Sequence, residues 1–352
     1  MIKIKTIRNR YEEVYDFQNL LIAHRRAKRG KATKTELLRF EEDLMCNLMA
    51  LKDELETKTY KVGNYRRFKV FEPKERDIMS LQYRDRIVQH IICDNILEPL
   101  LEPKLIYDNG ACRKGKGTHF TLNRLNTYMR KGYHKWGSEF YVLKCDVKQY
   151  FYSIDHEILR KYLYRHIADK DIQWLLDVII DSTDSDVGLP IGNMTSQWFA
   201  VFYLDALDKF IKQELKIQMY VRYMDDFVLL HNDKKHLQEC LRRIRAFLKD
   251  EMKLELNEKT QILPIRNGVD YIGFHSYLTK TGKIIRKLRK RSKAAMKRKI
   301  HRFNTAYAAG IMDYESIRQS VASWIGHAKH GNTYYLRQNI MGRLKLRKDD
   351  QK

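Results

Sequence analysis

Two short, largely apolar runs, Met219–Tyr223 and Phe227–His231, enclose the three residues Met224-Asp225-Asp226 and constrain the fold of this chain more than any other feature. Two strand-forming runs separated by so few residues predict a β-hairpin. The hairpin would carry two adjacent carboxylates at its tip, where a bound cation would relieve their mutual repulsion. Aspartate is also common at turns because its side chain bonds to the local backbone, so the pair alone has an ordinary structural explanation.

A third carboxylate, Asp146, ends the apolar run Phe140–Cys145, which predicts a buried strand. Nucleotidyl transfer uses two divalent ions that stabilise the attacking and leaving oxygens, and Mg²⁺ prefers oxygen ligands. Rigid strands suit such ligands because a misplacement of about 1 Å can lower the rate a hundredfold. The three aspartates are therefore candidates for a catalytic site that holds two Mg²⁺ ions, with Mn²⁺ as a substitute.

The charge of the chain indicates what it binds. Its 352 residues include 68 Lys and Arg against 44 Asp and Glu, a formal net charge of +24. Such an excess favours a polyanionic partner, first of all nucleic acid. A membrane is a weaker candidate because no run approaches the roughly 20 apolar residues that span a bilayer. The five scattered cysteines form no Cys-x-x-Cys pair, which predicts reduced thiols in the cytoplasm.

The rest of the sequence mixes helical and strand-like patterns. Leucines recur at helical spacing within 34–58, and 60–81 has a strand-like pattern. Further helices are expected at about 83–100 (ended near Pro99 and Pro103), 118–130, 156–180, 195–215 and 235–249, and a hairpin or turn at Tyr271–His275. Together these patterns predict an α+β protein.

Several segments resemble reverse transcriptases. Tyr220–Leu230 resembles their Tyr-x-Asp-Asp hairpin, and Leu143–Asp155 resembles their first palm strand. Other blocks follow in the family's order: two fingers blocks, the block with a late palm lysine, and the primer grip, at Phe71–Asp77, Arg84–His90, Leu256–Lys259 and Tyr271–Phe274. The resemblance covers about residues 60–345. It implies a right-hand polymerase with an antiparallel palm sheet, divided into an N-terminal helical extension (1–57), fingers (58–140), palm (141–280) and a basic helical thumb (281–352).

The block Gly188–Gln197 separates subgroups of that family. Many reverse transcriptases carry Gln-Gly and Ser-Pro where this chain has Ile191-Gly192 and Ser196-Gln197. This form resembles the reverse transcriptases of diversity-generating retroelements, as does Trp324–His327. That resemblance implies error-prone copying of a template RNA in a bacterial or phage-infected cell, with errors opposite adenines, and a small basic accessory protein that assembles as a pentamer. A retron-like or defence-associated reverse transcriptase and a non-catalytic RNA-binding scaffold remain alternatives.

The resemblance also implies roles for individual residues. Asp146, Asp225 and Asp226 would bind the metal ions with the Val147 carbonyl, and Lys259 would protonate the pyrophosphate leaving group. The residues expected at the incoming dNTP are Lys74, Arg76, Phe151, Ile191, Gly192 and Gln197. Among them, the Phe151 ring would clash with a ribose 2′-OH, and Ile191 cannot form the hydrogen bond that glutamine would, which predicts low fidelity.

Contacts to the template RNA and the RNA–cDNA duplex are expected from a larger, mostly basic set. Between Lys283 and Arg302, 11 of 20 residues are Lys or Arg and none is acidic, which predicts strongly salt-dependent binding. Trp324 and Tyr334 are interpreted as core residues of the thumb, although both could stack on bases. The full set of expected contacts is Arg113, Lys114, Lys116, Tyr223, Met224, Gly273, Arg286, Lys287, Arg289, Lys290, Arg291 and Lys293.

Overall fold

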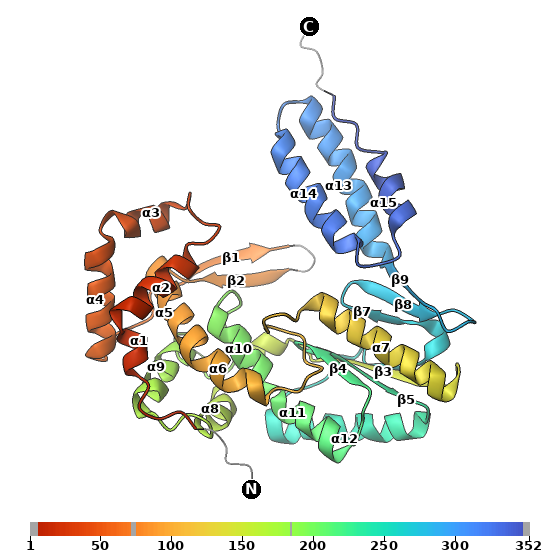
Figure 1. Cartoon of the computed structure of the whole chain (residues 1–352), viewed down its shortest axis with the longest axis horizontal. Coiled ribbons are helices and arrows are strands. Elements are labelled where there is room, and N and C mark those ends of the chain that lie inside the picture. The colour runs from red at the N-terminus through yellow and green to blue at the C-terminus, as the bar shows by residue number, and fades with distance from the viewer. Residues whose placement is uncertain (1–5, 72–74, 184, 348–352) are drawn as a thin grey trace. The chain divides into compact units, whose positions relative to one another are not determined.

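A computed structural model describes residues 6–71, 75–183 and 185–347 of the chain (Figure 1). The chain forms two compact units. The first comprises Met1–Gly115, Asp146–Lys216 and Arg242–Glu258, and the second Lys116–Cys145, Ile217–Leu241 and Lys259–Lys352. Residues of the predicted palm segment, 141–280, therefore contribute to both units.

The first unit begins with short helices: α1 (Glu12–Tyr15), α2 (Phe17–Ala27), α3 (Thr35–Glu42) and α4 (Leu44–Glu56). The single helix expected within 34–58 is divided at Asp43, whose φ of −132° and ψ of 52° are not helical. The predicted leucine face of α4 is buried, since Leu48, Leu51 and Leu55 are at most 2% exposed. Helix α4 packs on α1 and α2, so the apolar stripe explains why these helices associate.

An exposed hairpin and a long helical run follow. Strands β1 (Arg66–Val70) and β2 (Arg76–Ser80) pair antiparallel, after which come α5 (Tyr83–Ile91), the π-helical η1 (Ile92–Leu97), α6 (Glu98–Leu101) and the 3₁₀ turn η2 (Glu102–Lys104). The helical path ends close to where it was expected, since α6 stops at Leu101 and only the short turn η2, which contains Pro103, follows it to Lys104. The π-helical turn η1 between α5 and α6 was not predicted.

The remainder of the first unit is mostly helical. It contains the 3₁₀ turn η3 (Tyr150–Tyr152), α8 (His156–Tyr164), α9 (Lys170–Ile180), α10 (Met194–Tyr203), α11 (Asp205–Lys209) and the π-helical η4 (Phe210–Glu214). The Asp155 and Asp169 carboxylates cap α8 and α9 by accepting backbone N–H groups. Helix α10 is buried on most of its surface, as expected for a helix that is apolar on nearly all sides.

A four-stranded sheet forms the centre of the second unit (Figure 1). Its strand order is β4 (Tyr220–Tyr223), β5 (Asp226–His231), β3 (Tyr141–Asp146) and β6 (Gln261–Pro264), with β4–β5 and β3–β6 antiparallel. Helix α7 (Thr118–Trp136) packs against β4 and β5. The helix exceeds its predicted length and ends at Gly137, whose φ of 59° suits glycine at a helix end.

A second sheet and a helical bundle complete this unit. The turn η5 (Ile265–Asn267) precedes β7 (Val269–Tyr271), β8 (Phe274–Leu278) and β9 (Ile284–Leu288), which form an antiparallel sheet in that order. The hairpin predicted at Tyr271–His275 is confirmed, with both turn residues, Ile272 and Gly273, at positive φ. The bundle consists of α13 (Lys290–Ala308), α14 (Tyr314–Ala328) and α15 (Tyr334–Met341).

The structure confirms the predicted α+β class, because helices pack on sheets whose strands pair antiparallel. Helix α12 (Lys234–Met252) begins in the second unit and ends in the first. Of the two aromatic residues interpreted as thumb core, Trp324 does pack against the buried clusters. Tyr334 does not, since it is 60% exposed at the start of α15. None of the helices within the described ranges is long and apolar enough to cross a membrane.

Candidate active site

The β4–β5 hairpin brings Asp225 and Asp226 to a tight turn. Tyr223 pairs with Asp226, so the loop has two residues, Met224 and Asp225, and not the three that the sequence predicted. Met224 closes the turn with a φ of 54°, which side chains other than glycine adopt at some cost. The two carboxylates therefore have different backbone settings. Asp225 belongs to the turn itself, and Asp226 opens strand β5.

Asp226 lies beside a lysine of the neighbouring strand. Lys144 Nζ is 3.7 Å from Asp226 Oδ2, and each side chain is about a quarter exposed (22% and 24%). Lys144 belongs to β3 and stands two residues before Asp146, the last residue of that strand. The sheet order thus places the strand that ends in Asp146 next to the strand that begins with Asp226. Sequence reasoning missed Lys144, although a charged residue inside an apolar strand was a usable signal.

The chain beyond β3 is held by backbone bonds. The Asp146 carbonyl accepts the Asn257 N–H at 2.7 Å, and Lys148 N–H donates to the Glu255 carbonyl at 2.9 Å. Between these bonds, the buried Val147 forms an antiparallel bridge with Leu256. The late palm block predicted at Leu256–Lys259 therefore pairs with the segment that follows Asp146, and Lys259, two residues beyond Asn257, is exposed.

The donor chemistry of these aspartates fits a divalent metal ion. Within the described ranges, no three His, Cys, Asp or Glu side chains are gathered in an arrangement that could hold an ion by themselves. Mg²⁺ in phosphoryl-transfer sites is bound by one or two carboxylates together with substrate phosphates and waters. Carboxylates on two adjacent strands therefore have the oxygen chemistry that such an ion needs.

Backbone bonds hold two of the residues predicted to contact the nucleotide within the first unit. The Ile191 carbonyl accepts the Met79 N–H of β2 at 3.0 Å, and the Phe151 carbonyl accepts the Leu189 N–H at 2.7 Å. At Gly192 the φ is 129°, and a Cβ there would approach the Met79 carbonyl oxygen to 3.0 Å. Glycine is therefore required where this loop crosses β2.

Two of the other predicted nucleotide contacts are exposed. Arg76 is an exposed residue of β2, and Gln197 is exposed on α10, where its side-chain oxygen accepts a 3.5 Å bond from the Cys112 thiol. Lys74 lies outside the described residues.

The structure gives Arg113 a structural role within its loop. Its guanidinium donates to Glu102 Oε1 and to the carbonyls of Ile106 and Asn109, at 2.6–3.1 Å, and its side chain is 7% exposed. This placement argues against the predicted contact with template phosphates. Lys114 is exposed, so a contact with template phosphates stays a prediction for it. The Lys116 Nζ lies 4.9 Å from the centroid of the Phe120 ring.

The basic segment predicted to follow a phosphate backbone is divided between interior and surface. Arg286 is 6% exposed. Its guanidinium donates to the carbonyls of His330 and Leu122, each at 2.9 Å, and to Asn123 Oδ1 at 3.2 Å. Burial lowers the pKa of Arg286, and its bonds tie β9 to α7 and to the loop before α15. Arg286 is therefore better explained as a structural residue than as a phosphate contact.

The neighbours of Arg286 in this segment are accessible, and so is the predicted primer-grip turn. Lys287, Arg289, Lys290 and Arg291 are exposed, and Lys293 is partly exposed. Tyr223, Met224 and Gly273 are partly exposed as well, each in or beside a hairpin turn.

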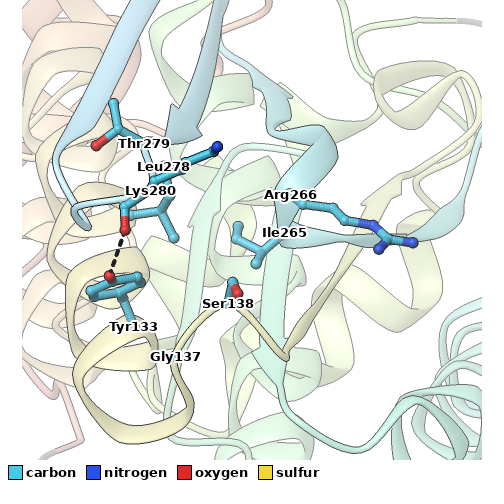
Figure 2. Close-up of a pocket in the computed structure, with 8 residues that line it drawn as sticks. All are labelled: Tyr133, Gly137, Ser138, Ile265, Arg266, Leu278, Thr279 and Lys280. Atoms are coloured by element: carbon cyan, nitrogen blue, oxygen red, sulfur yellow. Dashed lines mark hydrogen bonds between the residues drawn. The ribbon is translucent and has the colours of Figure 1, made fainter.

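A separate cavity of about 410 Å³ lies in the second unit, and its lining includes Tyr133, Ser138, Arg266 and Lys280 (Figure 2). The Tyr133 hydroxyl donates to the Lys280 carbonyl at 2.9 Å across its edge. None of the residues predicted for chemistry lines this cavity. The candidate carboxylates lie away from this cavity, and Asp225 and Asp226 are partly exposed at the hairpin turn.

These features belong to a known class of enzyme. The model of the family described as reverse transcriptase (RNA-dependent DNA polymerase) matches residues 72–276, more than half of the chain. The chain therefore belongs to the reverse transcriptase family and is an RNA-directed DNA polymerase by class.

Two relatives and one solved structure illustrate the range of similar proteins. Protein YkfC of Escherichia coli K12 is 26% identical over 275 residues, which cover 65% of this chain and 71% of YkfC. The group II intron-encoded protein LtrA of Lactococcus lactis subsp. cremoris is 24% identical over 241 residues, covering 64% of this chain and 38% of LtrA. A telomerase from Candida albicans superposes with a TM-score of 0.48 at 12% identity, covering 70% of this chain and 51% of that one.

Proposed function

We propose that this reverse transcriptase copies a template-repeat RNA of a diversity-generating retroelement into cDNA that carries mutations opposite adenines. The polymerase part of the proposal rests above all on one observation, the tight β4–β5 turn bearing Asp225 and Asp226 beside the strand that ends in Asp146. The subgroup rests on Ile191-Gly192 and Ser196-Gln197, which depart from the Gln-Gly and Ser-Pro of many family members.

The proposed chemistry is nucleotidyl transfer at the three aspartates. When bound there, two divalent ions, Mg²⁺ or its substitute Mn²⁺, would stabilise the charges of the attacking and leaving oxygens. The chain's own part is to hold Asp146, Asp225 and Asp226, with the Val147 carbonyl, on a tight turn and at strand ends whose backbone positions are fixed. Exposure of the Lys259 ammonium supports its proposed role as proton donor to the leaving pyrophosphate.

The proposed low fidelity depends on the loop that crosses β2. The bond from Met79 N–H to the Ile191 carbonyl supports a position of Ile191 beside the strand that carries Arg76. An isoleucine side chain offers no hydrogen bond to a nascent base pair. The difference in binding free energy between a correct pair and a mispair is therefore smaller than with glutamine. In the same unit, the Phe151 ring is proposed to exclude ribonucleotides by clashing with their 2′-OH.

The proposed macromolecular partners are the template RNA, the RNA–cDNA duplex and a small basic accessory protein. Exposed cations at Lys287, Arg289, Lys290 and Arg291 support contacts with phosphates. A different surface supports the protein partner. Residues 35–56, which form α3 and α4, carry seven acidic and two basic side chains within a chain of net charge +24.

Helix α4 also exposes apolar side chains. Met45 and Met49 are 57% and 44% exposed and stand four residues apart, followed at the same spacing by the exposed Asp53. Phosphates would be repelled by such a face, whereas a basic protein with an apolar patch would match it. We expect Met45→Lys with Met49→Lys to abolish copurification with a small basic protein encoded beside this chain, while RNA binding is kept.

The decisive experiment is cDNA synthesis on a defined RNA template with all four dNTPs and Mg²⁺, followed by sequencing of the products. The control is the double variant Asp225→Ala, Asp226→Ala. Errors concentrated opposite template adenines, lost in the control, support the retroelement function. Accurate cDNA that is lost in the control favours a retron-like or defence-associated enzyme.

Absence of cDNA needs one further step, because the accessory protein and the cognate RNA could be required. The assay is then repeated with both added. If RNA binding persists without any synthesis under those conditions, the non-catalytic scaffold replaces the proposed enzyme.

A further inference from the structure

Strand β4 buries an arginine immediately before the catalytic turn. Arg222 has no exposed surface, although arginine is almost never fully buried unless it is paired. Removing a guanidinium from water is costly unless its donors are satisfied. One of these donors is directed at the turn, since Arg222 Nη1 donates to the Met224 carbonyl at 2.9 Å. Arg222 therefore holds the peptide that joins Met224 to Asp225.

That peptide needs a partner because of its conformation. Met224 has a φ of 54° in a two-residue turn, a region that costs a residue with a Cβ roughly 1–2 kcal/mol. Such a conformation persists only where the surroundings over-determine it. The bond from Arg222 fixes the Met224 carbonyl and with it the orientation of the next peptide plane, which carries Asp225.

A second side chain reaches the same turn from a distant part of the sequence. Tyr271, the last residue of β7, is fully buried, and its hydroxyl donates to the Asp226 carbonyl at 3.1 Å. Asp226 pairs with Tyr223 to close the turn, so the phenol holds the end of the turn at which β5 begins.

We propose that Arg222 and Tyr271 are positioning residues that set the Asp225 and Asp226 carboxylates for metal binding. We call the two side chains the turn clamp. This inference rests on the proposed function of the two aspartates as metal ligands. The turn clamp donates to the carbonyls of Met224 and Asp226, which flank Asp225. It therefore acts through the backbone and not by binding substrate. Its loss should weaken metal binding and slow catalysis, because small displacements of ligands are costly, without changing the affinity for dNTP.

The cleanest test removes only the phenol oxygen. Tyr271→Phe keeps the buried ring, and Tyr203→Phe is its matched control. Tyr203 is also fully buried, and its hydroxyl donates to the Met252 carbonyl at 2.7 Å in the other unit, so both variants lose one buried hydrogen bond of the same kind. Arg222→Lys, which keeps the charge without the planar fork, tests the second half of the clamp.

Two readouts are needed for the full chain bound to a primer and an RNA template. One is direct binding of Mn²⁺, followed by electron paramagnetic resonance. The other is primer extension at varied Mg²⁺ and dNTP concentrations. For Tyr271→Phe we expect the half-saturating metal concentration to rise about two- to tenfold, as for one lost hydrogen bond, with a fall in kcat and a KM for dNTP within about twofold of the parent. Arg222→Lys should change the same quantities, and Tyr203→Phe should change none of them.

Each result has a distinct meaning. Parental Mn²⁺ binding and kcat in both Tyr271→Phe and Arg222→Lys overturn the clamp. Equal losses in Tyr271→Phe and Tyr203→Phe also overturn it, since they would reflect general destabilisation. By contrast, if the double variant Asp225→Ala, Asp226→Ala still extends the primer as the parent does, the proposed function itself is overturned.

Discussion

Replacement of Arg286 by methionine separates a structural arginine from a nucleic-acid contact. The guanidinium donates to two backbone carbonyls and to one side-chain oxygen inside the second unit. Methionine fills much of the same space but supplies no donor. The buried Leu122 carbonyl and the partly buried His330 carbonyl then lose this partner. We therefore expect Arg286→Met to destabilise the second unit and to leave the salt dependence of RNA binding unchanged.

The expected size follows from the lost bonds. A buried polar group that loses its partner costs about 1–3 kcal/mol. Two carbonyls and the Asn123 oxygen lose a donor, and the removal of a costly buried charge offsets part of the loss. We therefore expect Arg286→Met to lower the free energy of unfolding by about 3 kcal/mol. At about 2–4 °C per kcal/mol for a unit of some 150 residues, the thermal midpoint should fall by roughly 6–12 °C.

The assay combines calorimetry with RNA binding measured at several salt concentrations. Lys290→Met is the comparison, because Lys290 is exposed at the start of α13. That variant should keep the parental midpoint and lower the slope of log K against log salt by about one, as for one lost phosphate contact. If Arg286→Met behaves in this way instead, with an unchanged midpoint and a shallower slope, the structural reasoning is refuted.

Three further predictions concern fidelity, sugar selection and pH. Ile191→Gln should lower misincorporation opposite adenine severalfold in sequenced cDNA, and an unchanged error spectrum would contradict the proposed role of the loop. Phe151→Ala should increase ribonucleotide incorporation by the enzyme, measured with mixed dNTP and rNTP pools; parental selectivity would remove Phe151 from sugar selection. Burial, with nearby lysine and arginine side chains, lowers the pKa of His166 to about 4. The unfolded chain takes up this proton near its ordinary pKa of about 6.5, whereas the folded chain does so only near 4, so stability should fall as pH decreases through that window. His166→Gln should reduce the loss of thermal midpoint between pH 7 and pH 5, and an equal loss in both proteins would contradict this assignment.

Local patterns predicted much of the secondary structure and the family. The apolar runs around Met224-Asp225-Asp226 form the expected hairpin, and Asp146 ends the expected strand. These features depend on neighbours in the sequence, where strand propensity and turn chemistry act over a few residues. The class of enzyme was also accessible from the sequence, because ordered blocks carry the resemblance without any knowledge of the fold.

Local patterns were less informative where an element's limits depend on packing. The helix expected over about 83–100 ends near Pro99 and Pro103 as predicted, yet it contains the π-helical turn η1, which no local pattern marked. The helix within 34–58 is interrupted at Asp43, at a position that no proline or glycine marks. Tyr334 was interpreted as a core residue of the thumb, yet its side chain is exposed to solvent.

The tertiary structure alone decided which charged residues serve the fold. Arg286 and Lys287 are neighbours in one basic segment, but the first is buried among carbonyls and the second is exposed. Tyr271 and Asp226 stand 45 positions apart and share a hydrogen bond. Composition and spacing determined that the chain is basic and carries acids on a turn, and the resemblance to a known family indicated a polymerase. Which cations face solvent, and which side chains hold that turn, was decided by contacts between distant segments, because burial and hydrogen-bond partners are properties of the packed chain and not of the local sequence.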